Sequence, residues 1–579
     1  MAPGDRDRGR PPRSPGWACP EGAATCMADG NHHPMIAVLQ AQLAARRIGR
    51  RSFLRLATLL GTSAAAAAAM AGTSASAFAP QVAQRRGGRL TLGGRVHPMS
   101  DPHALAWLEP ANVVHQVCGT LTRTGFDNIT RPHLLSHWRA SPDLTTWDLH
   151  LRDDVFWRSG RRFLAEDVAW NLRRLLDPAV GSSALGFMGD YMLADGTTPG
   201  SVAGTLWDAD AVELVDDFHL RLNLKSPQIA LPEHLFHFTN VMLDPEEEGR
   251  FGVGSNGTGP FTLVEYRVGE RALLRACESQ CGPAGGRRAQ LDELLLLDLG
   301  DEAAASAAAM VSGQVDGLMR CDYSVAEILA GRPGLQVHRT RTAATGMLQM
   351  KVDQKPFDDP RVRRALRLAI DVEEVTRLSL RGFGEPAEHH MVAPVHPCYA
   401  ALPAMGHHPA EARALLAEAG YPDGLDLTIT CKNWPQWELD SVQAMAAQYA
   451  AAGIRCTLEV LPAARFWEVW EKAPLAFVEW APRPLGFMLL DLTVRSGVPW
   501  NTTGFSDPEI DSLLSQVEAE PDIEDRRPLM RRIQKKMQEE GPVVQPSWLS
   551  VVTVMAERVG GFRLHPTTLL FAENYFLKA

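Results

Sequence analysis

Residues 425–461 read LDLTITCKNWPQWELDSVQAMAAQYAAAGIRCTLEVL, and this stretch decides the fold class of the chain. Its pattern predicts a strand over Leu425–Thr430 and a helix over Leu439–Ala452 that Gly453 ends. A second strand is predicted over Arg455–Leu461. Two strands joined through one helix lie parallel with a right-handed crossover, so we expect a parallel sheet that is buried on both faces.

The elements on either side of this β-α-β unit differ in kind. Further helices are predicted in the second half of the chain, where proline opens several first turns and glycine ends one helix. The first half instead shows strand pairs that are typical of antiparallel sheet. The predicted helices are Ala165–Leu176, Pro360–Ile370, Pro409–Gly420, Pro508–Val517 and Ile523–Glu540, and the predicted hairpins are Val212–Leu224 and Phe261–Ala276.

Composition bounds the class of protein. The 579 residues are 45% hydrophobic and 22% charged, which is enough apolar surface for large cores and several lobes. The net charge of -10 leaves no global basic field, so nucleic-acid binding is not expected.

The first 79 residues form a segment of opposite charge. They hold nine arginines against four acids, a net charge of +5, which leaves -15 for the rest of the chain. Arg50 and Arg51 precede an uncharged, alanine-rich run over Leu56–Met70, which is shorter than the ~20 residues that a membrane span needs. Small residues follow, with cleavage sites after Ala77 or Ala79. We expect residues 1–79 to be a cleaved twin-arginine signal region, and the mature protein to be exported to the periplasm.

Cysteine usage adds little. Seven cysteines remain after residue 79, and an odd number leaves at least one thiol free or paired between chains. Cys277 and Cys281 flank a predicted turn, and a local disulfide between them stays open as one alternative.

Six blocks, in the same order along the chain, resemble one family. The chain is similar to the extracytoplasmic solute-binding proteins of family 5, the peptide/nickel type, which serve ABC importers. The blocks are Pro132–Trp138 (PHLLSHW), Trp147–Trp157 (WDLHLRDDVFW), Ala165–Val168 (AEDV), Gly257–Phe261 (GTGPF), Phe357–Ala365 (FDDPRVRRA) running on to Asp371, and Ala412–Pro422 (ARALLAEAGYP).

The resemblance implies an α/β fold of the two-lobed periplasmic-binding-protein type (class II, cluster C), with an extra subdomain inserted in lobe I. Lobe I would comprise residues 88–118, 239–343 and 545–579, subdomain II residues 119–238, and lobe II residues 344–544. The chain crossings near 343 and 545 would form a hinge.

The resemblance also implies the function. A monomeric periplasmic protein would capture a peptide-like or other small organic ligand between its lobes and deliver it to an ABC permease and ATPase complex. No enzyme activity, cofactor or metal is expected. The alternatives are an exported cofactor-dependent enzyme, which the export signal suggests, and a ligand sensor or chaperone without transport. Against the enzyme, the sequence has none of the short catalytic, metal or phosphate-binding motifs in a suitable context.

Tryptophans gather in the second half of the chain. Aromatic faces can line a pocket, because they stack on rings, aliphatic chains and cations. Trp434, Trp437 and Trp480 stand near predicted loops and are candidate ligand-binding residues, with burial in the core as the alternative. Trp467 and Trp470 share one helical face and are expected in the core.

Arg483 is the fourth candidate ligand-binding residue. In peptide-binding relatives the corresponding loop reads like W-x-A-D, and its Asp pairs with the ligand's α-ammonium. Here Trp480 is followed by Ala, Pro and Arg483, so a cation stands where the acid would be. The guanidinium would favour a carboxylate or another electron-rich group; the alternative is that Arg483 faces solvent.

Two further patterns carry no functional prediction. Gly252–Gly257 fits G-x-G-x-x-G, but it lacks the preceding strand and following helix of a dinucleotide site. His389, His390, His396, His407 and His408 suggest a metal at first sight, yet we expect them in a surface loop, because adjacent residues of an extended chain point to opposite sides.

Overall fold

The computed structural model describes residues 84–579, with gaps at 86, 100, 106, 195–205, 278–281, 284–287, 499 and 579. The predicted signal region lies outside the described residues, and so does Cys281, so the export prediction and the Cys277–Cys281 alternative stay untested. Among the described helices, none is long and apolar enough to cross a membrane.

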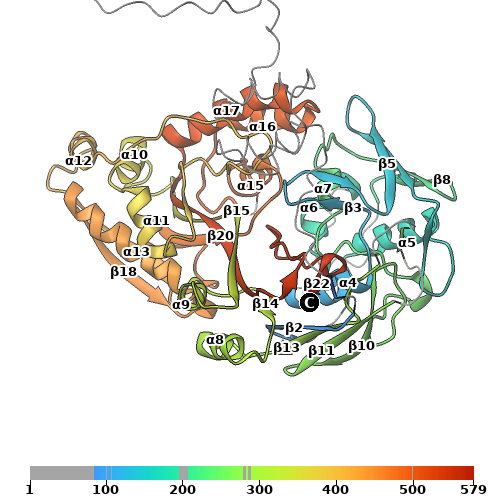
Figure 1. Cartoon of the computed structure of the whole chain (residues 1–579). Coiled ribbons are helices and arrows are strands. Elements are labelled where there is room, and N and C mark those ends of the chain that lie inside the picture. Colours follow the sequence, from blue (N-terminus) through green and yellow to red (C-terminus); the bar gives the residue numbers. More distant parts are fainter. Residues whose placement is uncertain are drawn as a thin grey trace, which may run out of the picture. The chain divides into compact units, whose positions relative to one another are not determined.

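One mixed sheet of eleven strands runs through the described part (Figure 1). We call its two ends the β2 half, made of β10, β11, β13, β2 and β14, and the β17 half, made of β19, β17 and β18. In order across the sheet the strands are β10 (Phe261–Arg267), β11 (Arg271–Ala276), β13 (Glu293–Asp298), β2 (Arg89–Gly94), β14 (Gly317–Leu318), β20 (Val543–Ala556), β15 (Leu335–Met350), β19 (Leu475–Trp480), β17 (Leu425–Lys432) and β18 (Ile454–Leu461), with β16 (Glu385–Pro386) beside β20.

The long strands β15 and β20 join the two halves. They pair with each other antiparallel, while β20 also pairs with β14 at one end and β15 with β19 at the other. Their register shifts between Arg341 and Thr345 and again between Gly346 and Leu348. A register shift bends and twists a strand locally, so the two halves meet at a bend in a paired ribbon.

The β2 half has a core that draws on both ends of the described chain. Leu90 and Leu92 alternate with more exposed residues along β2 and pack in one apolar cluster with Tyr575 and Leu577. Helix α4 (Leu108–Val117) adds its buried face to this cluster. Nearby elements are α8 (Ala303–Ser312), α9 (Tyr323–Leu329), β1 (Gln84–Arg85), β21 (Val559–Gly560), β22 (Phe576–Lys578) and the 3-10 turns Pro102–Ala104, Pro245–Glu247 and Ala572–Asn574.

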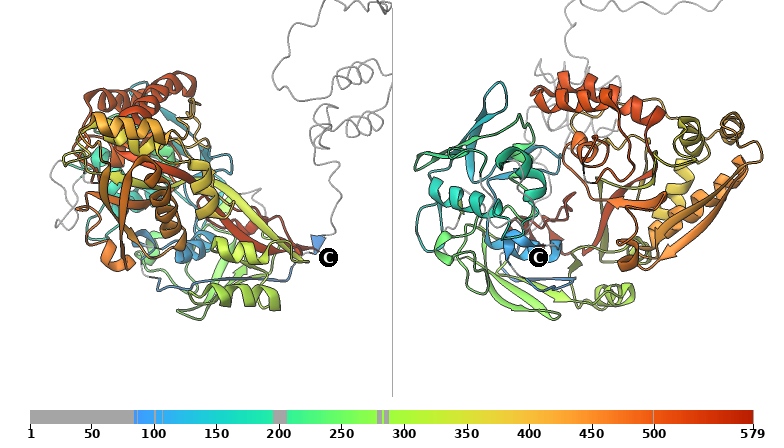
Figure 2. Two further views of the ribbon diagram at one scale, coloured as in Figure 1. Left: turned by 90° about the vertical axis from the view of Figure 1, so that its left-hand side faces the viewer. Right: turned by 180° about the vertical axis from the view of Figure 1, so that it is seen from behind.

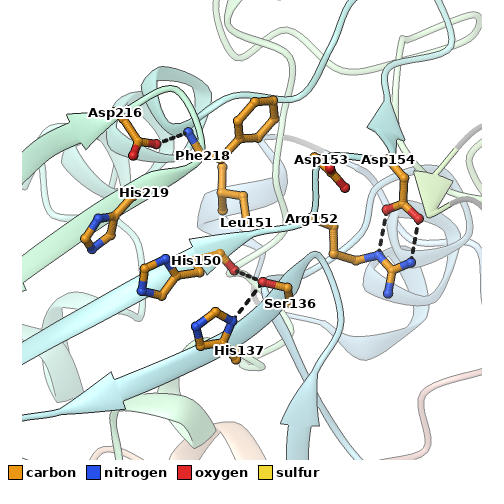
Figure 3. Close-up of a pocket in the computed structure, with 10 residues that line it drawn as sticks. All are labelled: Ser136, His137, His150, Leu151, Arg152, Asp153, Asp154, Asp216, Phe218 and His219. Atoms are coloured by element: carbon orange, nitrogen blue, oxygen red, sulfur yellow. Dashed lines mark hydrogen bonds and ion pairs between the residues drawn. The ribbon is translucent and has the colours of Figure 1, made fainter.

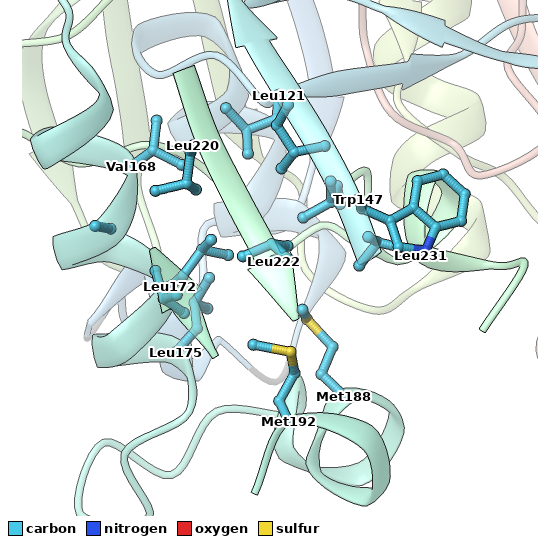
Figure 4. Close-up of a cluster of buried hydrophobic side chains, with 14 of the residues drawn as sticks. Leu121, Trp147, Val168, Leu172, Leu175, Met188, Met192, Leu220, Leu222 and Leu231 are labelled. Atoms are coloured by element: carbon cyan, nitrogen blue, oxygen red, sulfur yellow. The ribbon is translucent and has the colours of Figure 1, made fainter. Parts of the chain in front are cut away.

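A second core belongs to a four-stranded antiparallel sheet, which we call the four-stranded unit together with its helices. Trp147, Leu149 and Leu151 alternate along one strand and face helix residues such as Val168 and Leu172 (Figure 4). The predicted hairpin over Val212–Leu224 is confirmed. The strands in order are β5 (Leu135–Ala140), β6 (Thr146–Leu151), β9 (His219–Asn223) and β8 (Val212–Asp216), with helices α5 (Ala165–Leu175), α6 (Leu185–Met192) and α7 (Leu231–His234) and the short strands β3 (Thr122–Thr124), β4 (Thr130–Pro132), β7 (Val155–Phe156) and β12 (Gly282–Pro283).

The β17 half contains the predicted β-α-β unit. Strands β17 and β18 are parallel, and α13 (Gln436–Tyr449) with a 3-10 turn over Ala450–Ala452 connects them. The expectation of burial on both faces is wrong, because β18 is an edge strand and β17 exposes Asp426 and Thr428 opposite the helix-covered face. Helices of this part are α10 (Pro360–Leu368), α11 (Val372–Leu380), α12 (Pro409–Glu418), α14 (Ala463–Phe466), α15 (Gly486–Thr493), α16 (Pro508–Ala519) and α17 (Ile523–Glu540).

Two predictions on burial are wrong. His389, His390 and His396 are buried rather than on a surface loop, because their rings satisfy neighbouring backbone and side-chain groups; the His389 Nδ1, for example, accepts from the Gln545 backbone N–H at 2.9 Å. Trp467, which follows the short helix α14, is 48% exposed and not in the core, since this turn of the chain lies at the surface with Arg465 and Glu468 exposed beside it.

Within the described part, the elements of residues 119–242 and those of residues 409–461 lie at opposite ends (Figures 1 and 2). Separate apolar clusters form around these two regions. The exact lobe boundaries given above stay a prediction.

Candidate functional site

A cavity of about 260 Å³, which we call the central cavity, opens where the two halves of the sheet meet. The bend of β15 contributes Thr342 and Ala344, and β20 contributes residues 549–552. The β2 half adds residues 320–324 around the start of α9, and the β17 half adds residues 434–437 together with Glu479, Ala481 and Pro482. Segments from most of the chain therefore converge on one space.

The place of the central cavity follows from the topology. Residues 434–437 come directly after β17, and Ala481 and Pro482 come directly after β19, which runs parallel to β17. Loops at the carboxyl ends of parallel strands form the usual ligand crevice of open α/β sheets. The fold thus positions these loops as walls of a binding site.

Two predicted ligand-binding residues, Trp434 and Trp437, lie on the wall of the central cavity. Trp434 is 64% exposed, whereas Trp437 is partly buried and stands edge-on to Phe477, with ring centroids 6.1 Å apart. An indole exposed to water beside a cavity is unfavourable in free energy until another apolar group covers it. The exposed ring of Trp434 is therefore suited to receive a ligand.

Charged side chains of both signs surround these rings. Asp322, Asp440 and Glu479 line the central cavity with Arg320 and Arg381. Arg381 pairs with Glu327 at 2.8 Å, and Asp440 accepts from the Gln436 amide at 2.7 Å. Within residues 84–579 as described, Glu479 is half-buried and its carboxylate has no hydrogen bond or ion pair, so it is the acid of this cavity most in need of a cation.

Trp480 and Arg483 do not line the central cavity. Trp480 follows Glu479 on the same strand and points to the opposite face, where it packs between Trp470 and Trp500 at 6.1 and 6.0 Å. It is buried, and its indole nitrogen has no hydrogen-bond partner within the described part of the chain. The ligand-binding role of both residues stays a prediction.

Arg483 faces the four-stranded unit. Its guanidinium acts electrostatically on His234 and His237, and burial lowers the pKa of the Arg483 side chain. Burial, with the Arg483 charge adding to it, lowers the pKa of both histidines to about 3, so they are neutral at ordinary pH. None of the described carboxylates forms an ion pair with Arg483.

The contact between these parts continues beside Arg483. Asn128, in the turn between β3 and β4, donates to the Pro484 carbonyl at 2.6 Å and to the Val395 carbonyl at 3.4 Å. Ile229 and Ala230 pack with the apolar cluster that holds Phe487 and Trp480. The loop after β19 thus touches the central cavity on one side and the four-stranded unit on the other.

A second hollow, of about 650 Å³, lies on the four-stranded unit (Figure 3). His137, His150 and His219 stand side by side on three neighbouring strands, with ring centroids 4.2 Å apart in each pair. Stacked rings do not aim their nitrogens at one point, and no group of three or more His, Cys, Asp or Glu in the described residues is arranged to hold a metal ion. This hollow comes from a single sheet and does not involve the junction of the two halves.

The fold and the central cavity together define a two-lobed binding protein, in which loops from both halves of a divided sheet enclose one small site. Comparison with known proteins agrees. The sequence profile of the bacterial extracellular solute-binding proteins, family 5, matches residues 130–489, and the chain belongs to this family.

Among similar proteins is the glutathione-binding protein GsiB of Pectobacterium atrosepticum, 24% identical over 464 residues, which cover 76% of this chain and 84% of GsiB. Similar solved structures include the periplasmic binding protein DppA of Helicobacter pylori in complex with the peptide STSA (20% identity, TM-score 0.67, 86% and 99% of the two chains). Another is the murein tripeptide binding protein MppA of Escherichia coli (20%, TM-score 0.67, 85% and 99%).

The predicted family and fold class are therefore confirmed, and the chain is an extracellular solute-binding protein of this family. Sequence reasoning did not single out Glu479, Asp322 or Arg320 as cavity residues. For Glu479 a signal was present: an acid at the carboxyl end of a buried strand, one residue before Trp480. Nothing in the sequence shows that residues 320–324 approach it, because this contact depends on the long-range pairing of β14, β15 and β20.

Proposed function

We propose that the central cavity binds a small peptide-like zwitterion, of which glutathione is the first example to test. The observation that carries the proposal is the carboxylate of Glu479 on the cavity wall, which has no partner among the described residues. A ligand ammonium would form an ion pair with the Glu479 carboxylate, and the rings of Trp434 and Trp437 would pack against the rest of the ligand. The cavity volume of about 260 Å³ suits a short ligand rather than a long peptide. Relatives named for glutathione and for short peptides support this ligand class.

Calorimetry on Glu479→Gln tests the proposal. The parent should bind glutathione, and the variant should bind about 10- to 150-fold more weakly, because a charge-assisted hydrogen bond contributes ~1.5–3 kcal/mol. Glu373→Gln, which removes an exposed glutamate of α11 outside the cavity, is the matched control and should bind like the parent.

An N-acetylated tripeptide adds a matched ligand without the ammonium. We expect it to bind the parent weakly and to be indifferent to Glu479→Gln. If Glu479→Gln binds glutathione within twofold of the parent, Glu479 is not the ammonium site.

Arg483 lies beside the central cavity rather than on its wall. We therefore propose that it holds a carboxylate of a ligand that extends past Pro482 towards the four-stranded unit, with the neutral His234 and His237 as further hydrogen-bonding groups there. Its partly buried guanidinium, which forms no ion pair with any carboxylate that the structure describes, supports this role. Arg483→Ala should weaken glutathione binding by one to two orders of magnitude. Arg483→Lys should recover only part of the loss, because lysine restores the charge but not the planar, two-pronged guanidinium. Binding of Arg483→Ala within twofold of the parent would rule the role out.

We further propose that a monomer carries out this capture without covalent chemistry, and that the chain reaches the periplasm by the twin-arginine route. Arg50, Arg51 and the small residues up to Ala79 support the route. Replacing both arginines by lysine should leave uncleaved precursor in the cytoplasm, which cell fractionation would detect. Unimpaired export of the double variant would contradict the twin-arginine route.

A further inference from the structure

The two tryptophans of the cavity wall belong to a seven-residue segment whose ends are linked by an ion pair. Lys432 is the last residue of β17, and Glu438 lies in the first turn of α13. The Lys432 Nζ is 2.9 Å from the Glu438 Oε1. The side chains are only 5% and 0% exposed, so the pair is inside the β17 half while Trp434 and Trp437 face the cavity.

Lys432 is held from a second side by aromatic rings. Its Nζ lies 5.6 Å from the ring centroid of Phe466, the last residue of α14, and 4.4 Å from that of Trp467, which follows it. Cation–π contacts of this kind gain strength when the cation is removed from water. The ammonium therefore joins β17, α14 and α13 at one point.

Glu438 depends on Lys432. The Lys432 Nζ, 2.9 Å from Oε1, is the one group that contacts the Glu438 carboxylate, and no other donor within the part of the chain that the structure describes reaches either oxygen. Lys432 is the only cation that acts on Glu438 there, whereas the cavity acid Glu479 repels it. Removing Lys432 would leave a buried acid without compensation, which is expensive.

We propose that Lys432 and Glu438 are positioning residues of the central cavity, which hold the segment 432–438 so that Trp434 and Trp437 present their rings to the ligand. This inference rests on the proposed function, since it assigns the central cavity to the ligand. Neither side chain lines the cavity, so neither is expected to touch the ligand.

The geometry favours positioning over a purely stabilising role. A buried ion pair is weak support for stability, because desolvation offsets its attraction. This pair closes a short loop at both ends, and Trp437 is adjacent to Glu438 in the chain. A displacement of Glu438 would therefore rotate the first turn of α13 and move the indole of Trp437 directly.

The test uses the full-length mature protein labelled with 5-fluorotryptophan, with the fluorine resonances of Trp434 and Trp437 assigned by Trp→Phe variants. Lys432→Met removes the cation at similar volume, and Glu438→Gln is the second variant should Lys432→Met fail to accumulate. Lys536→Met is the matched control, because it breaks the ion pairs that Lys536 of α17 makes with Asp507 and Glu509 at the start of α16, away from the cavity. Glutathione affinity and thermal midpoint are measured on each variant.

Positioning predicts that Lys432→Met moves both resonances without ligand and weakens glutathione binding at least tenfold, while Lys536→Met does neither. The double variant Lys432→Met/Glu438→Gln should regain thermal stability, since no unsatisfied buried acid remains, but neither the parent resonances nor the parent affinity. If both resonances stay in place in Lys432→Met, or if affinity returns together with stability in the double variant, the inference is overturned. Should the parent itself not bind glutathione, the proposed function fails, and the ligand-free resonances still decide the positioning role.

Discussion

Glu438 is an acid that the surrounding residues keep from ionising readily. Burial raises its pKa from the ordinary 4.5 to about 8; Lys432 opposes the rise and Glu479 adds to it. Lys432 and Glu479 are the charged groups that act on Glu438 within the described residues. The charge of Glu438 acts in turn on the Cys431 thiol of β17, as does that of Glu459 on β18. The ion pair with Lys432 is therefore fully charged only above about pH 8; below that pH the contact at 2.9 Å holds a proton on Glu438 that the unfolded chain releases near pH 4.5.

This proton predicts a pH-dependent stability difference between the parent and Glu438→Gln. Because the pKa is raised in the folded state, the contribution of Glu438 is fully present below about pH 4.5 and is lost as the pH rises towards 8. The free energy of unfolding of the parent should thus fall relative to that of Glu438→Gln between pH 5 and pH 9. Urea unfolding at several pH values measures it, and a constant difference would mean an ordinary pKa.

At the same scale, the sequence predicts cavity residues only in part. Trp434 and Trp437 were identified because aromatic residues near loop ends often line pockets, and the structure places them on the cavity wall. The Asp of the W-x-A-D loop in peptide-binding relatives corresponds to Arg483, and this comparison led the sequence analysis to Arg483 rather than to Glu479. Glu479 lies in β19 and faces the cavity, whereas Arg483 lies in the loop after this strand and faces away from it. The direction of a loop side chain does not follow from the alternation of the strand, so the sequence alone does not predict it.

At the scale of elements, a buried arginine connects two helices. The side chain of Arg367 on α10 is fully buried, and burial lowers its pKa to about 9. It donates to the carbonyls of Glu539 at 2.7 Å and Gly541 at 2.6 Å, at the carboxyl end of α17. These carbonyls have no partner in their own helix, and a cation there also suits the helix dipole.

Arg367→Met should therefore destabilise the protein by about 2–4 kcal/mol, because it leaves buried carbonyls unsatisfied. Arg364→Met on the same helix is the control: its contact with Glu411 is long, at 3.6 Å, and both side chains are substantially exposed, so a change of less than ~1 kcal/mol is expected. Urea unfolding followed by circular dichroism measures both. Equal losses in the free energy of unfolding for the two substitutions would show that the buried hydrogen bonds of Arg367 stabilise the protein no more than the exposed contact of Arg364.

Elements were the most predictable level. The hairpins, the β-α-β unit and the helices near residues 360, 409, 508 and 523 occur close to their predicted positions, because periodicity, proline and glycine act locally. Burial was less predictable. The exposed face of β18 and the buried His389 and His390 depend on which element happens to cover them, and that is a property of the tertiary fold.

For the whole molecule, the bend of β15 and β20 is the expected site of motion between the lobes. The register shift between Arg341 and Thr345 spans the predicted hinge residue 343, and its residues Thr342 and Ala344 line the central cavity. A ligand in the cavity would touch the hinge as well as both lobes. Binding and bending are then coupled at one place.

We expect saturating glutathione to reduce the radius of gyration of the parent in small-angle scattering, because the lobes close on the ligand. Glu479→Gln, at a glutathione concentration that fills the parent but not the variant, should keep the ligand-free curve. A parent whose curve is unchanged at saturation would contradict hinge closure on this ligand.

The overall architecture was predictable through the six family blocks and not from local patterns alone. No periodicity reveals that β2 and β20, more than 400 residues apart, share one sheet. The resemblance supplied this arrangement, and the long-range strand pairs determine where the cavity lies.

The core of the β2 half has a further consequence for the timing of synthesis. Leu90 packs in the same cluster as Leu577, and β1 pairs with β22 at the far end of the chain. A ribosome adds ~5–20 residues per second, so the first strands wait roughly 25–100 s for their last partners. During that interval β2 can pair with β13 and β14 as soon as these are made, but β1 has no native strand partner and the cluster around Leu90 stays incomplete. We therefore expect chaperones to shield this unfinished edge until translation ends.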